Sequence, residues 1–272
     1  MGKRIAFIGG GNMASAIIGG LVRQGHPTSA LQVVEPWDEQ RAKLAQQFPG
    51  MSILPAASAE LKPSNLVVWA VKPQTFKDAA LASQPFLGNA LHLSVAAGIT
   101  TDSIAAWLGS ERIIRSMPNT PALIGKGITA LFGRPGVTQA DKDWANEVIA
   151  TTGATVWLTA EAQLDAVTAL SGSGPAYMFY FMEAMTDAGV RMGLDRNQAY
   201  QLAVATFIGA GELARASSEA PESLRAKVTS KGGTTYAAIT SMDESGIKDL
   251  FAKALFAAHH RAGELGAEFG KA

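Results

Sequence analysis

Through the first 160 residues, short apolar runs rich in β-branched and aromatic residues alternate with amphipathic or alanine-rich segments. Glycine, proline or polar clusters bound the apolar runs, which is typical of strands. Strands are therefore predicted at RIAFIG (4–9), LQVVE (31–35), NLVVWAV (65–71), LHLSVAA (91–97) and RIIRSM (112–117), and helices over 38–48, 74–86 and 102–108. Strands that alternate with helices indicate parallel βαβ units, so we expect an α/β fold with a doubly wound, Rossmann-like sheet.

The pattern changes after residue 159. GITALF (127–132) and ATVWLT (154–159) flank the helix-like stretch 139–151 and predict further strands of the same sheet. Beyond them no convincing strand pattern remains, and long Ala-, Met- and Leu-rich helices follow, some of them apolar on more than one face. Such helices must be buried, and a partner subunit is the simplest cover. We predict a dinucleotide-binding domain over 1–160 and an all-α dimerisation and substrate-binding domain over 161–272; a self-contained helical bundle is the alternative.

Composition narrows the classes of partner. Apolar residues make up 47 % of the chain, and 23 basic residues balance 23 acidic ones. A neutral chain argues against nucleic acid or an anionic membrane held by bulk electrostatics. Cysteine is absent, which excludes disulfides and thiolate metal sites, and no metal site is predicted. There is no run of about 18 apolar residues, so a cytoplasmic protein without a membrane span is expected.

A glycine-rich turn follows the first predicted strand. Gly9-x-Gly11-x-x-Ala14 stands directly after that strand and directly before a helix. The first glycine permits a tight turn, the second lets the backbone approach a pyrophosphate, and the helix N-terminus offers unpaired N–H groups to the anion. We therefore predict binding of NADH or NADPH. The expected coenzyme contacts here are Gly9, Gly11, Asn12, Met13 and Ala14.

Glu35 ends the second predicted strand. Its spacing from the turn suits an acid that accepts hydrogen bonds from the adenine-ribose diol, and an acid would also repel a 2′-phosphate. The residue is predicted to contact the coenzyme, with a preference for NADH; a solvated strand-end glutamate is the alternative.

Three further strand ends carry unusual residues. WAVKPQ includes Lys72 and Pro73, SVAAGI includes Gly98, and RSMPNTPA includes Asn119. Ligands of open α/β sheets bind beyond the carboxyl ends of the strands, so these loops favour a site on one edge. The coenzyme contacts expected on them are Ala70, Val71, Lys72, Pro73 and Asn119.

Two later motifs interrupt the helical part. LSGSGPAY is expected to break one helix at 171–175 and to start another, with Pro175 in its first turn and small residues, Ser173 among them, close to the nicotinamide and substrate. SKGGTT (230–235) precedes a helix, so Gly233, Thr234 and Thr235 are placed to turn backbone N–H groups toward an anion. A simple kink and an ordinary capped helix are the respective alternatives.

Taken in order, the glycine turn, AVKP, SVAAGI, MPNTPA, SGSGPAY and GGTT resemble pyrroline-5-carboxylate reductases over nearly the whole chain. The resemblance implies reduction of the cyclic imine to L-proline with NADPH or NADH, the last step of proline biosynthesis. It implies homodimers that often assemble into decamers. It also implies that Gly233, Thr234 and Thr235 hold the substrate carboxylate, and that the Thr235 hydroxyl contacts the ring nitrogen.

The sequence departs from the family at two positions. Many relatives have proline where Lys231 stands, so the loop is less rigid or the lysine attracts a carboxylate. Relatives that use NADPH often carry a small polar residue or a nearby basic one around Glu35, which puts the preference for NADPH in doubt.

The residues leave three other readings. β-Hydroxyacid dehydrogenases need a lysine base on the long interdomain helix, and 175–192 contains none. Reduction of another cyclic imino acid, or a non-enzymatic dinucleotide sensor, remains open. The reduction of a protonated imine needs little acid–base catalysis. In agreement with this, all four histidines (His26, His92, His259, His260) stand outside the site motifs. His92 is interpreted as a satisfied core residue.

Overall fold

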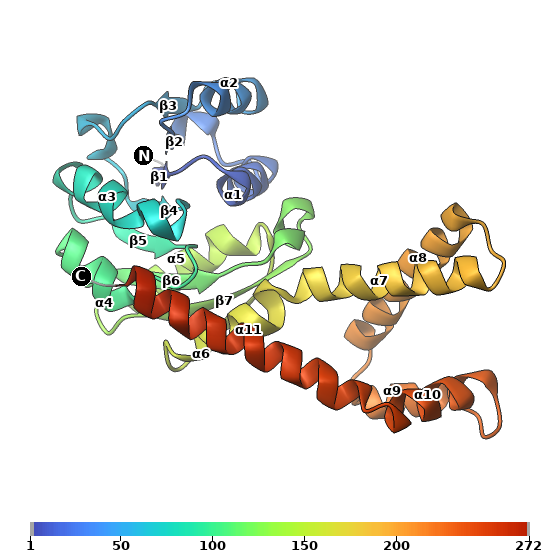
Figure 1. The fold of residues 1–272 in the computed structure, drawn as a ribbon. Helices are drawn as coiled ribbons and strands as arrows, with labels where there is room; N and C mark the ends of the chain where they lie inside the picture. The colour runs from blue at the N-terminus through green and yellow to red at the C-terminus, as the bar shows by residue number, and fades with distance from the viewer. Residues whose placement is uncertain (1–2, 271–272) are drawn as a thin grey trace. The chain divides into compact units, whose positions relative to one another are not determined.

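The computed structural model describes residues 3–270, and its strands form a single eight-stranded sheet among those residues (Figure 1). The strand order is β3-β2-β1-β4-β5-β6-β7-β8. The strands are β1 (Ile5–Ile8), β2 (Leu31–Val34), β3 (Ser52–Leu54), β4 (Leu66–Trp69), β5 (Leu91–Ser94), β6 (Ile113–Met117), β7 (Gly127–Gly133) and β8 (Gly153–Trp157). All seven strands predicted from the sequence are present, and β3 is an addition that its three residues were too short to signal.

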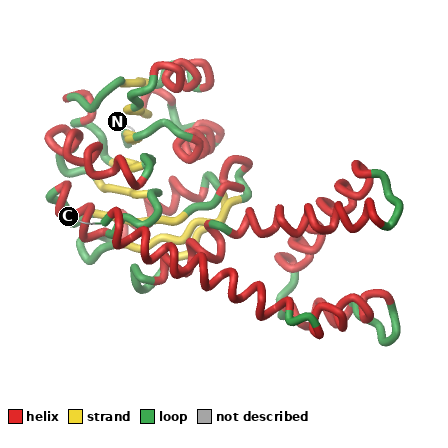
Figure 2. The backbone as a smooth tube through the Cα atoms, viewed as in Figure 1, coloured by secondary structure: helices red, strands yellow, loops and turns green. Residues whose placement is uncertain are grey.

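Eleven α-helices are described within residues 3–270. They are α1 (Asn12–Arg23), α2 (Asp38–Gln47), α3 (Pro73–Ser83), α4 (Thr101–Leu108), α5 (Gln139–Ala150), α6 (Gln163–Val167), α7 (Gly174–Arg191), α8 (Arg196–Ala216), α9 (Pro221–Lys227), α10 (Thr234–Glu244) and α11 (Ile247–Phe269). Beyond β8 the described chain is helical and contains no strand, as Figure 2 shows by its red and yellow tubes.

The sheet is parallel except at one pair of strands. β1 to β6 all run parallel, β7 is antiparallel to β6, and β8 is parallel to β7. The predicted parallel βαβ units and the two further strands are present, and the antiparallel direction of β7 is a feature that the sequence analysis did not address. The nine residues between β6 and β7 are too few for the helical crossover that a parallel neighbour requires. The carboxyl ends of β1, β2, β4, β5 and β6 consequently share one edge of the sheet.

Both faces of the sheet are buried along β1, β2, β4 and β5. In β1, Ile5 and Phe7 belong to one apolar cluster, and Ala6 and Ile8 belong to a second one. The first cluster includes side chains of α1, α2 and α5, and the second includes side chains of α3 and α4. Since successive side chains of a strand point to opposite faces, these helices cover the two faces of a doubly wound sheet. The predicted fold class is confirmed.

The chain forms two compact units. The first comprises residues 1–173 and 258–272, so the end of α11 packs with the sheet, and the second comprises Gly174–Ala257. In the first unit, the Ser103 Oγ donates a hydrogen bond to the Gly270 carbonyl oxygen at 2.6 Å, which anchors the last turn of the chain to α4. The division into domains at 160/161 stays a prediction.

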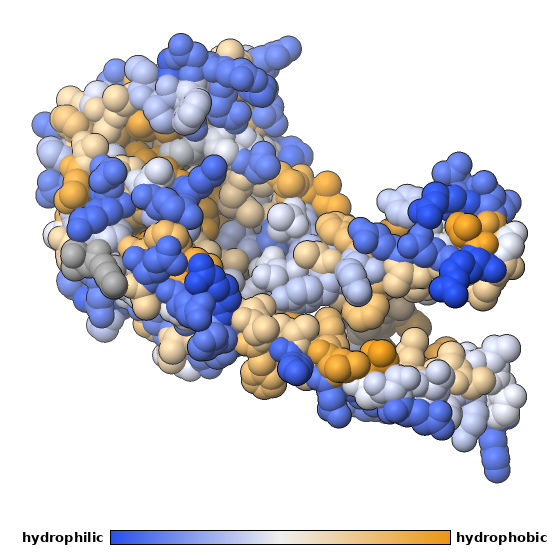
Figure 3. Space-filling model, viewed as in Figure 1, coloured by the Kyte–Doolittle hydropathy of each residue, from blue (hydrophilic) through white to orange (hydrophobic). Residues whose placement is uncertain are grey.

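The helical unit leaves many apolar side chains on its own surface. α7 and α8 pack against each other, and Phe251 of α11 makes edge-on ring contacts with Tyr177 and Phe181 of α7. Phe179, Tyr180 and Ile208 are nevertheless 58 %, 69 % and 60 % exposed, and Figure 3 shows apolar side chains on this surface. Exposed apolar area of this kind marks an interaction surface. Among residues 3–270 no helix is long and apolar enough to cross a membrane, and the expected cytoplasmic location stays a prediction.

Candidate active site

The glycine turn forms a tight connection between β1 and α1. Gly9 has φ +93°, a backbone conformation that favours glycine. A Cβ added there would lie 2.7 Å from the carbonyl oxygen of Ala70 and 3.0 Å from Cγ1 of Val71. The AVKP loop after β4 therefore lies directly against the turn. Two of its predicted contact residues, Ala70 and Val71, touch the first glycine.

The outer side of the turn is open. A Cβ added to Gly11 would meet no atom within 4 Å, and Gly11 caps α1 without a side chain. The N–H groups at the start of α1, including those of Asn12 and Met13, have no helical acceptor, and Ala14 is fully buried beneath them. Open space in front of unpaired N–H groups fits the diphosphate of a dinucleotide.

Glu35 lies at the end of β2 with only 6 % of its surface exposed. Its Oε2 accepts the N–H of Gly10 at 2.9 Å, and its Oε1 accepts the N–H of Trp37 at 3.0 Å. Nearby, the Arg41 guanidinium donates to the carbonyl oxygen of Glu35 at 2.9 Å and also pairs with Asp38. The sequence indicated the acid but not this arrangement, because a hydrogen bond from the turn to a strand-end carboxylate has no signature in the residue pattern.

Lys72 and Pro73 start α3 on the same edge of the sheet. Lys72 is the exposed N-cap residue, and Pro73 occupies the first helical position, where its missing N–H costs nothing. The Lys72 carbonyl oxygen accepts hydrogen bonds from both the N–H and the hydroxyl of Thr75. The ammonium group of Lys72 stands free at the carboxyl edge of the sheet within the described chain.

Asn119 connects two of the predicted motifs. Its Nδ2 donates to the carbonyl oxygen of Ser171 at 3.2 Å, and its Oδ1 accepts the N–H of Ile128 at 3.0 Å. The MPNTPA loop is thereby attached to the SGSGPAY motif and to the start of β7. Both polar atoms of the Asn119 side-chain amide therefore form hydrogen bonds with the protein backbone.

The SGSG motif contains a π-helical turn instead of a helix break. Residues Thr168–Gly172 form this turn after α6, and α7 begins at Gly174 with Pro175 in its first turn, as predicted. π-Turns within helices occur frequently at functional sites. Ser173 is half-buried directly after the turn, and its N–H donates to the Thr168 carbonyl oxygen at 2.9 Å.

Gly98 serves the packing of the C-terminal helix. It has φ +77°, and a Cβ there would lie 3.3 Å from the backbone nitrogen of Gly266 in α11. Two glycines thus let the loop after β5 and the end of α11 approach each other closely. The strand-end motif SVAAGI is explained by this approach.

The helical unit carries the GGTT segment at the start of α10. Gly232 has φ +75°, Gly233 is the N-cap residue of α10, and Thr234 is its first residue, so the predicted helix start is confirmed. Thr235 is half-buried, and within residues 3–270 its hydroxyl has no hydrogen-bond partner. Lys231 is exposed beside this segment. The N–H of Gly233, which was predicted to face an anion, donates instead to the Ser230 carbonyl oxygen at 3.0 Å. The N–H groups of Thr234 and Thr235 lie in the first helical turn, where no helical acceptor exists, and they suit a carboxylate.

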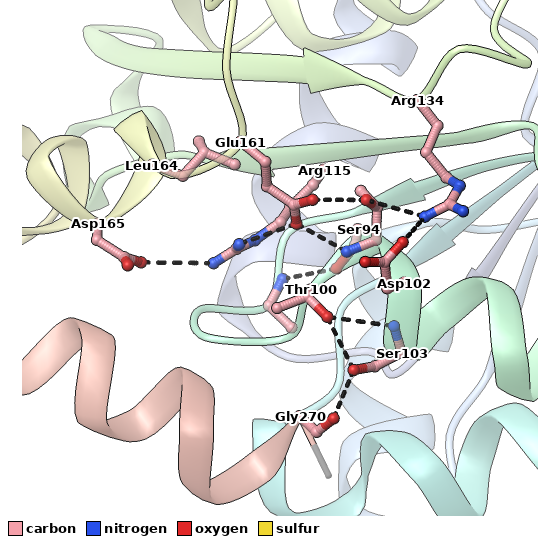
Figure 4. A network of polar contacts seen from close by, with 12 residues as sticks. Ser94, Thr100, Asp102, Ser103, Arg115, Arg134, Glu161, Leu164, Asp165 and Gly270 are labelled. Atoms are coloured by element: carbon pink, nitrogen blue, oxygen red, sulfur yellow. Dashed lines mark hydrogen bonds and ion pairs between the residues drawn. The ribbon is translucent and has the colours of Figure 1, made fainter. Parts of the chain in front are cut away.

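A charged network missed by the sequence interpretation fixes the segment that leads to the π-turn (Figure 4). Arg115 in β6 is buried, and its Nη1 lies 3.1 Å from Oε1 of Glu161. Glu161 also accepts the N–H of Thr101 at 2.7 Å and its hydroxyl at 2.6 Å. Oδ1 of Asp165 lies 3.9 Å from Nη2 of Arg115. The sequence signal for this network was the pair of carboxylates in EAQLD (161–165), which stand four residues apart.

His92 belongs to the core, as interpreted from the sequence. It is 2 % exposed, and its Nδ1 accepts a hydrogen bond from Nε1 of Trp69 at 3.4 Å. Burial and, to a smaller extent, the Arg112 cation lower the pKa of His92 to about 4. The imidazole is therefore neutral at pH 7 and has no place in the chemistry of the site.

Comparisons with known proteins agree with this arrangement. Residues 161–265 match the family model for pyrroline-5-carboxylate reductase dimerisation, and residues 4–98 match the model for coenzyme F420-dependent NADP oxidoreductases. The chain is 44 % identical to the pyrroline-5-carboxylate reductase of Pseudomonas aeruginosa over 98 % of both chains. The solved reductase from Coxiella burnetii has a TM-score of 0.91 at 36 % identity, over 97 % of this chain and 98 % of that one. The Plasmodium falciparum enzyme, solved with NADP bound, has a TM-score of 0.85 at 27 % identity, over 97 % and 98 %.

The sheet, its glycine turn and the helical unit define an NAD(P)H-dependent oxidoreductase with a helical dimerisation domain. Within that class, the chain belongs to the pyrroline-5-carboxylate reductase family. The predicted reductase of a C=N bond in proline biosynthesis is confirmed, and so is its use of NAD(P)H. The dimerisation domain implies that the chain forms a homo-oligomer.

Proposed function

We propose that the residues predicted from the sequence divide the reduction of pyrroline-5-carboxylate to L-proline between two half-sites. In one of them, Gly9, Gly11, Asn12, Met13 and Ala14 bind the coenzyme diphosphate. The observation that supports this role is the open space in front of Gly11, next to N–H groups that lack acceptors. The bound coenzyme supplies the hydride.

The second half-site is the start of α10. The N–H groups of Thr234 and Thr235 bind the substrate carboxylate, whose negative charge the helix N-terminus favours. The N–H of Gly233 is used by the Ser230 carbonyl oxygen, so Gly233 serves the site by letting the substrate approach a backbone without a side chain. The Thr235 hydroxyl, which is free among the described residues, contacts the ring nitrogen by accepting a hydrogen bond from the N–H of the protonated imine, and it holds the imine in one orientation. Ser173, in the SGSG segment, is proposed as a further residue that contacts the substrate. Orientation of the substrate and exclusion of water provide most of the rate enhancement, because the carbon of an imine that is protonated on nitrogen accepts hydride readily.

The loops after β4 and β6 complete the coenzyme site. Ala70, Val71, Lys72 and Pro73 line it beside the glycine turn, since Ala70 and Val71 already touch Gly9. Asn119 acts at its far side by holding the SGSG segment through Ser171. Glu35, which was predicted to contact the coenzyme, belongs to this site through its hydrogen bond to Gly10 in the glycine turn.

The homo-oligomer is proposed to be built from homodimers. α7 and α8 line an apolar hollow of about 740 Å³ with Phe179, Met182, Tyr200, Val204 and Ile208, which a second copy would fill. A dimer formed in this way covers the exposed side chains that the helical unit cannot bury alone. Assembly of such dimers into decamers stays a prediction.

The experiment that tests this function is steady-state oxidation of NADH and of NADPH with racemic pyrroline-5-carboxylate, with the product identified by chromatography. We expect L-proline in an amount equal to the coenzyme oxidised. Faster turnover with the six-membered homologue would move the assignment to another cyclic imino acid. Coenzyme binding without any turnover would support a sensor and contradict the proposal.

A further inference from the structure

Gly10, between the two glycines that approach the coenzyme, is held from both sides by the strand and helix that follow. Its N–H donates to Oε2 of Glu35 at 2.9 Å. Its carbonyl oxygen accepts a hydrogen bond from Nε2 of Gln40, in the first turn of α2, at 2.7 Å. The two peptide groups that meet at Gly10 are therefore fixed by two side chains of the β2–α2 segment.

Packing reinforces these hydrogen bonds. Gly10 is buried, and a Cβ added there would lie 2.5 Å from Cδ1 of Leu44 and 3.2 Å from Cγ1 of Val33. Gly11, the next residue, faces open space. The turn thus has an inner side that grips β2 and α2 and an outer side that is left for a ligand.

The carboxylate of Glu35 is directed at this inner side. Each of its oxygens accepts one backbone N–H, from Gly10 or from Trp37, and the side chain is 6 % exposed. A carboxylate that selects NADH must present an oxygen to the adenine-ribose diol or its charge to a 2′-phosphate. Hydrogen bonds to a charged acceptor are strong, so the inward orientation of Glu35 is well stabilised.

We propose that Glu35 and Gln40 are positioning residues that orient the glycine turn, and that Glu35 does not choose between NADH and NADPH. They fix the Gly10 peptides, so that the N–H groups of the turn and of α1 face the diphosphate. The diphosphate is common to both coenzymes, and the loss of either hydrogen bond weakens both equally. The inference rests on the proposed role of the turn in coenzyme binding.

Glu35→Gln is the variant that separates positioning from selection. A glutamine presents one acceptor oxygen and one NH₂ group, so either Gly10 or Trp37 faces a donor instead of an acceptor. The dissociation constants of NADH and NADPH are measured by titration calorimetry. We expect both to rise by the same factor, about tenfold. At saturating coenzyme, kcat and the KM for the imine stay within about twofold, because the hydride is transferred at the other end of the coenzyme.

Glu39→Gln is the matched control. It removes the same charge from the first turn of α2, where Glu39 is exposed and pairs with Lys43. We expect both dissociation constants to stay at their wild-type values. Gln40→Leu removes only the hydrogen bond to the Gly10 carbonyl oxygen, and it decides the question if Glu35→Gln fails to fold. It is expected to weaken both coenzymes in parallel.

Three outcomes would overturn the inference. Tighter NADPH binding in Glu35→Gln would mean that the charge repels the 2′-phosphate, and weaker NADH binding alone would mean that the carboxylate accepts from the ribose. Unchanged binding of both coenzymes in Glu35→Gln and Gln40→Leu would show that the contacts to Gly10 do not matter. Failure of the wild-type protein to bind either coenzyme would contradict the proposed function itself, and is thus distinguishable.

Discussion

The side-chain amide of Asn119 joins segments 52 residues apart by donating to the carbonyl oxygen of Ser171 at 3.2 Å. Its oxygen accepts the N–H of Ile128 at 3.0 Å, so the loop after β6, the start of β7 and the π-turn are held as one piece. We therefore predict that Asn119 contributes to the site by positioning Ser173, two residues beyond its acceptor.

Replacement of Asn119 by alanine tests this role. We expect kcat/KM for the imine to fall about tenfold and the free energy of unfolding to fall by about 1–2 kcal/mol, because two hydrogen bonds are lost. Asn146→Ala is the control, since the Asn146 amide accepts from Thr155 at 2.6 Å on α5. It should lower stability without lowering kcat/KM. Steady-state kinetics and denaturant unfolding give both quantities, and an Asn119→Ala enzyme as active as Asn146→Ala would contradict the role.

Glu161 is predicted to be the most important carboxylate of the network in Figure 4 for stability. Glu161→Ala leaves the buried Arg115 with Asp165 at 3.9 Å as its remaining carboxylate partner and leaves the N–H of Thr101 without its acceptor. Removal of one partner from a buried pair costs about 3 kcal/mol or more.

The exposed pair Lys43–Glu39 provides the comparison, because exposed ion pairs contribute little and Glu39→Gln should leave the free energy of unfolding nearly unchanged. Urea unfolding of both variants measures the two costs. Equal losses of unfolding free energy in Glu161→Ala and Glu39→Gln would contradict the importance of the network.

His92 makes stability depend on pH. Its folded-state pKa of about 4 lies below the ordinary value of 6.5, so between these values the unfolded chain binds a proton that the folded chain does not. The stabilisation is complete above pH 6.5 and is lost as the pH falls toward 4, by up to about 3 kcal/mol.

His92→Asn keeps an acceptor for Trp69 but has no titrating ring. Its unfolding free energy, followed by denaturant titration from pH 7 to pH 4, is expected to fall less steeply than that of the wild-type protein. The carboxylates are common to both proteins and cancel in the comparison. Identical slopes for His92→Asn and the wild-type protein would show that His92 titrates normally.

β1, β2, β4 and β5 could be predicted because they are buried on both faces and have continuous apolar runs in the sequence. The strand Ser52–Leu54 was not predicted, because three half-buried residues are too few to show the alternation of apolar and polar positions that is typical of a strand. The antiparallel direction of β7 was within reach of the sequence, since the nine residues between β6 and β7 cannot hold a crossover helix. Connection length was the overlooked signal.

Candidate residues for the site could be named from the sequence, and their roles stay predictions; their hydrogen-bond partners could not be named. The glycine turn and GGTT carry local signatures, whereas the bonds Glu35–Gly10, Asn119–Ser171 and Arg115–Glu161 join residues 25, 52 and 46 positions apart. Such pairs depend on how the sheet brings strand ends together. Glu35 and Asn119 could be singled out because each follows a predicted strand. The backbone groups that they contact could be identified only in the folded structure.

The central claim is that the Thr235 hydroxyl, at the start of α10, holds the imine for hydride transfer. The most direct test compares Thr235→Ala with Thr235→Ser, and with Thr240→Ala further along the same helix as the control. We predict that Thr235→Ala lowers kcat about a hundredfold or more, that the serine variant recovers most of it, and that the dissociation constant of the coenzyme is unchanged in all three. A Thr235→Ala enzyme with the kcat of the wild-type protein would contradict the account.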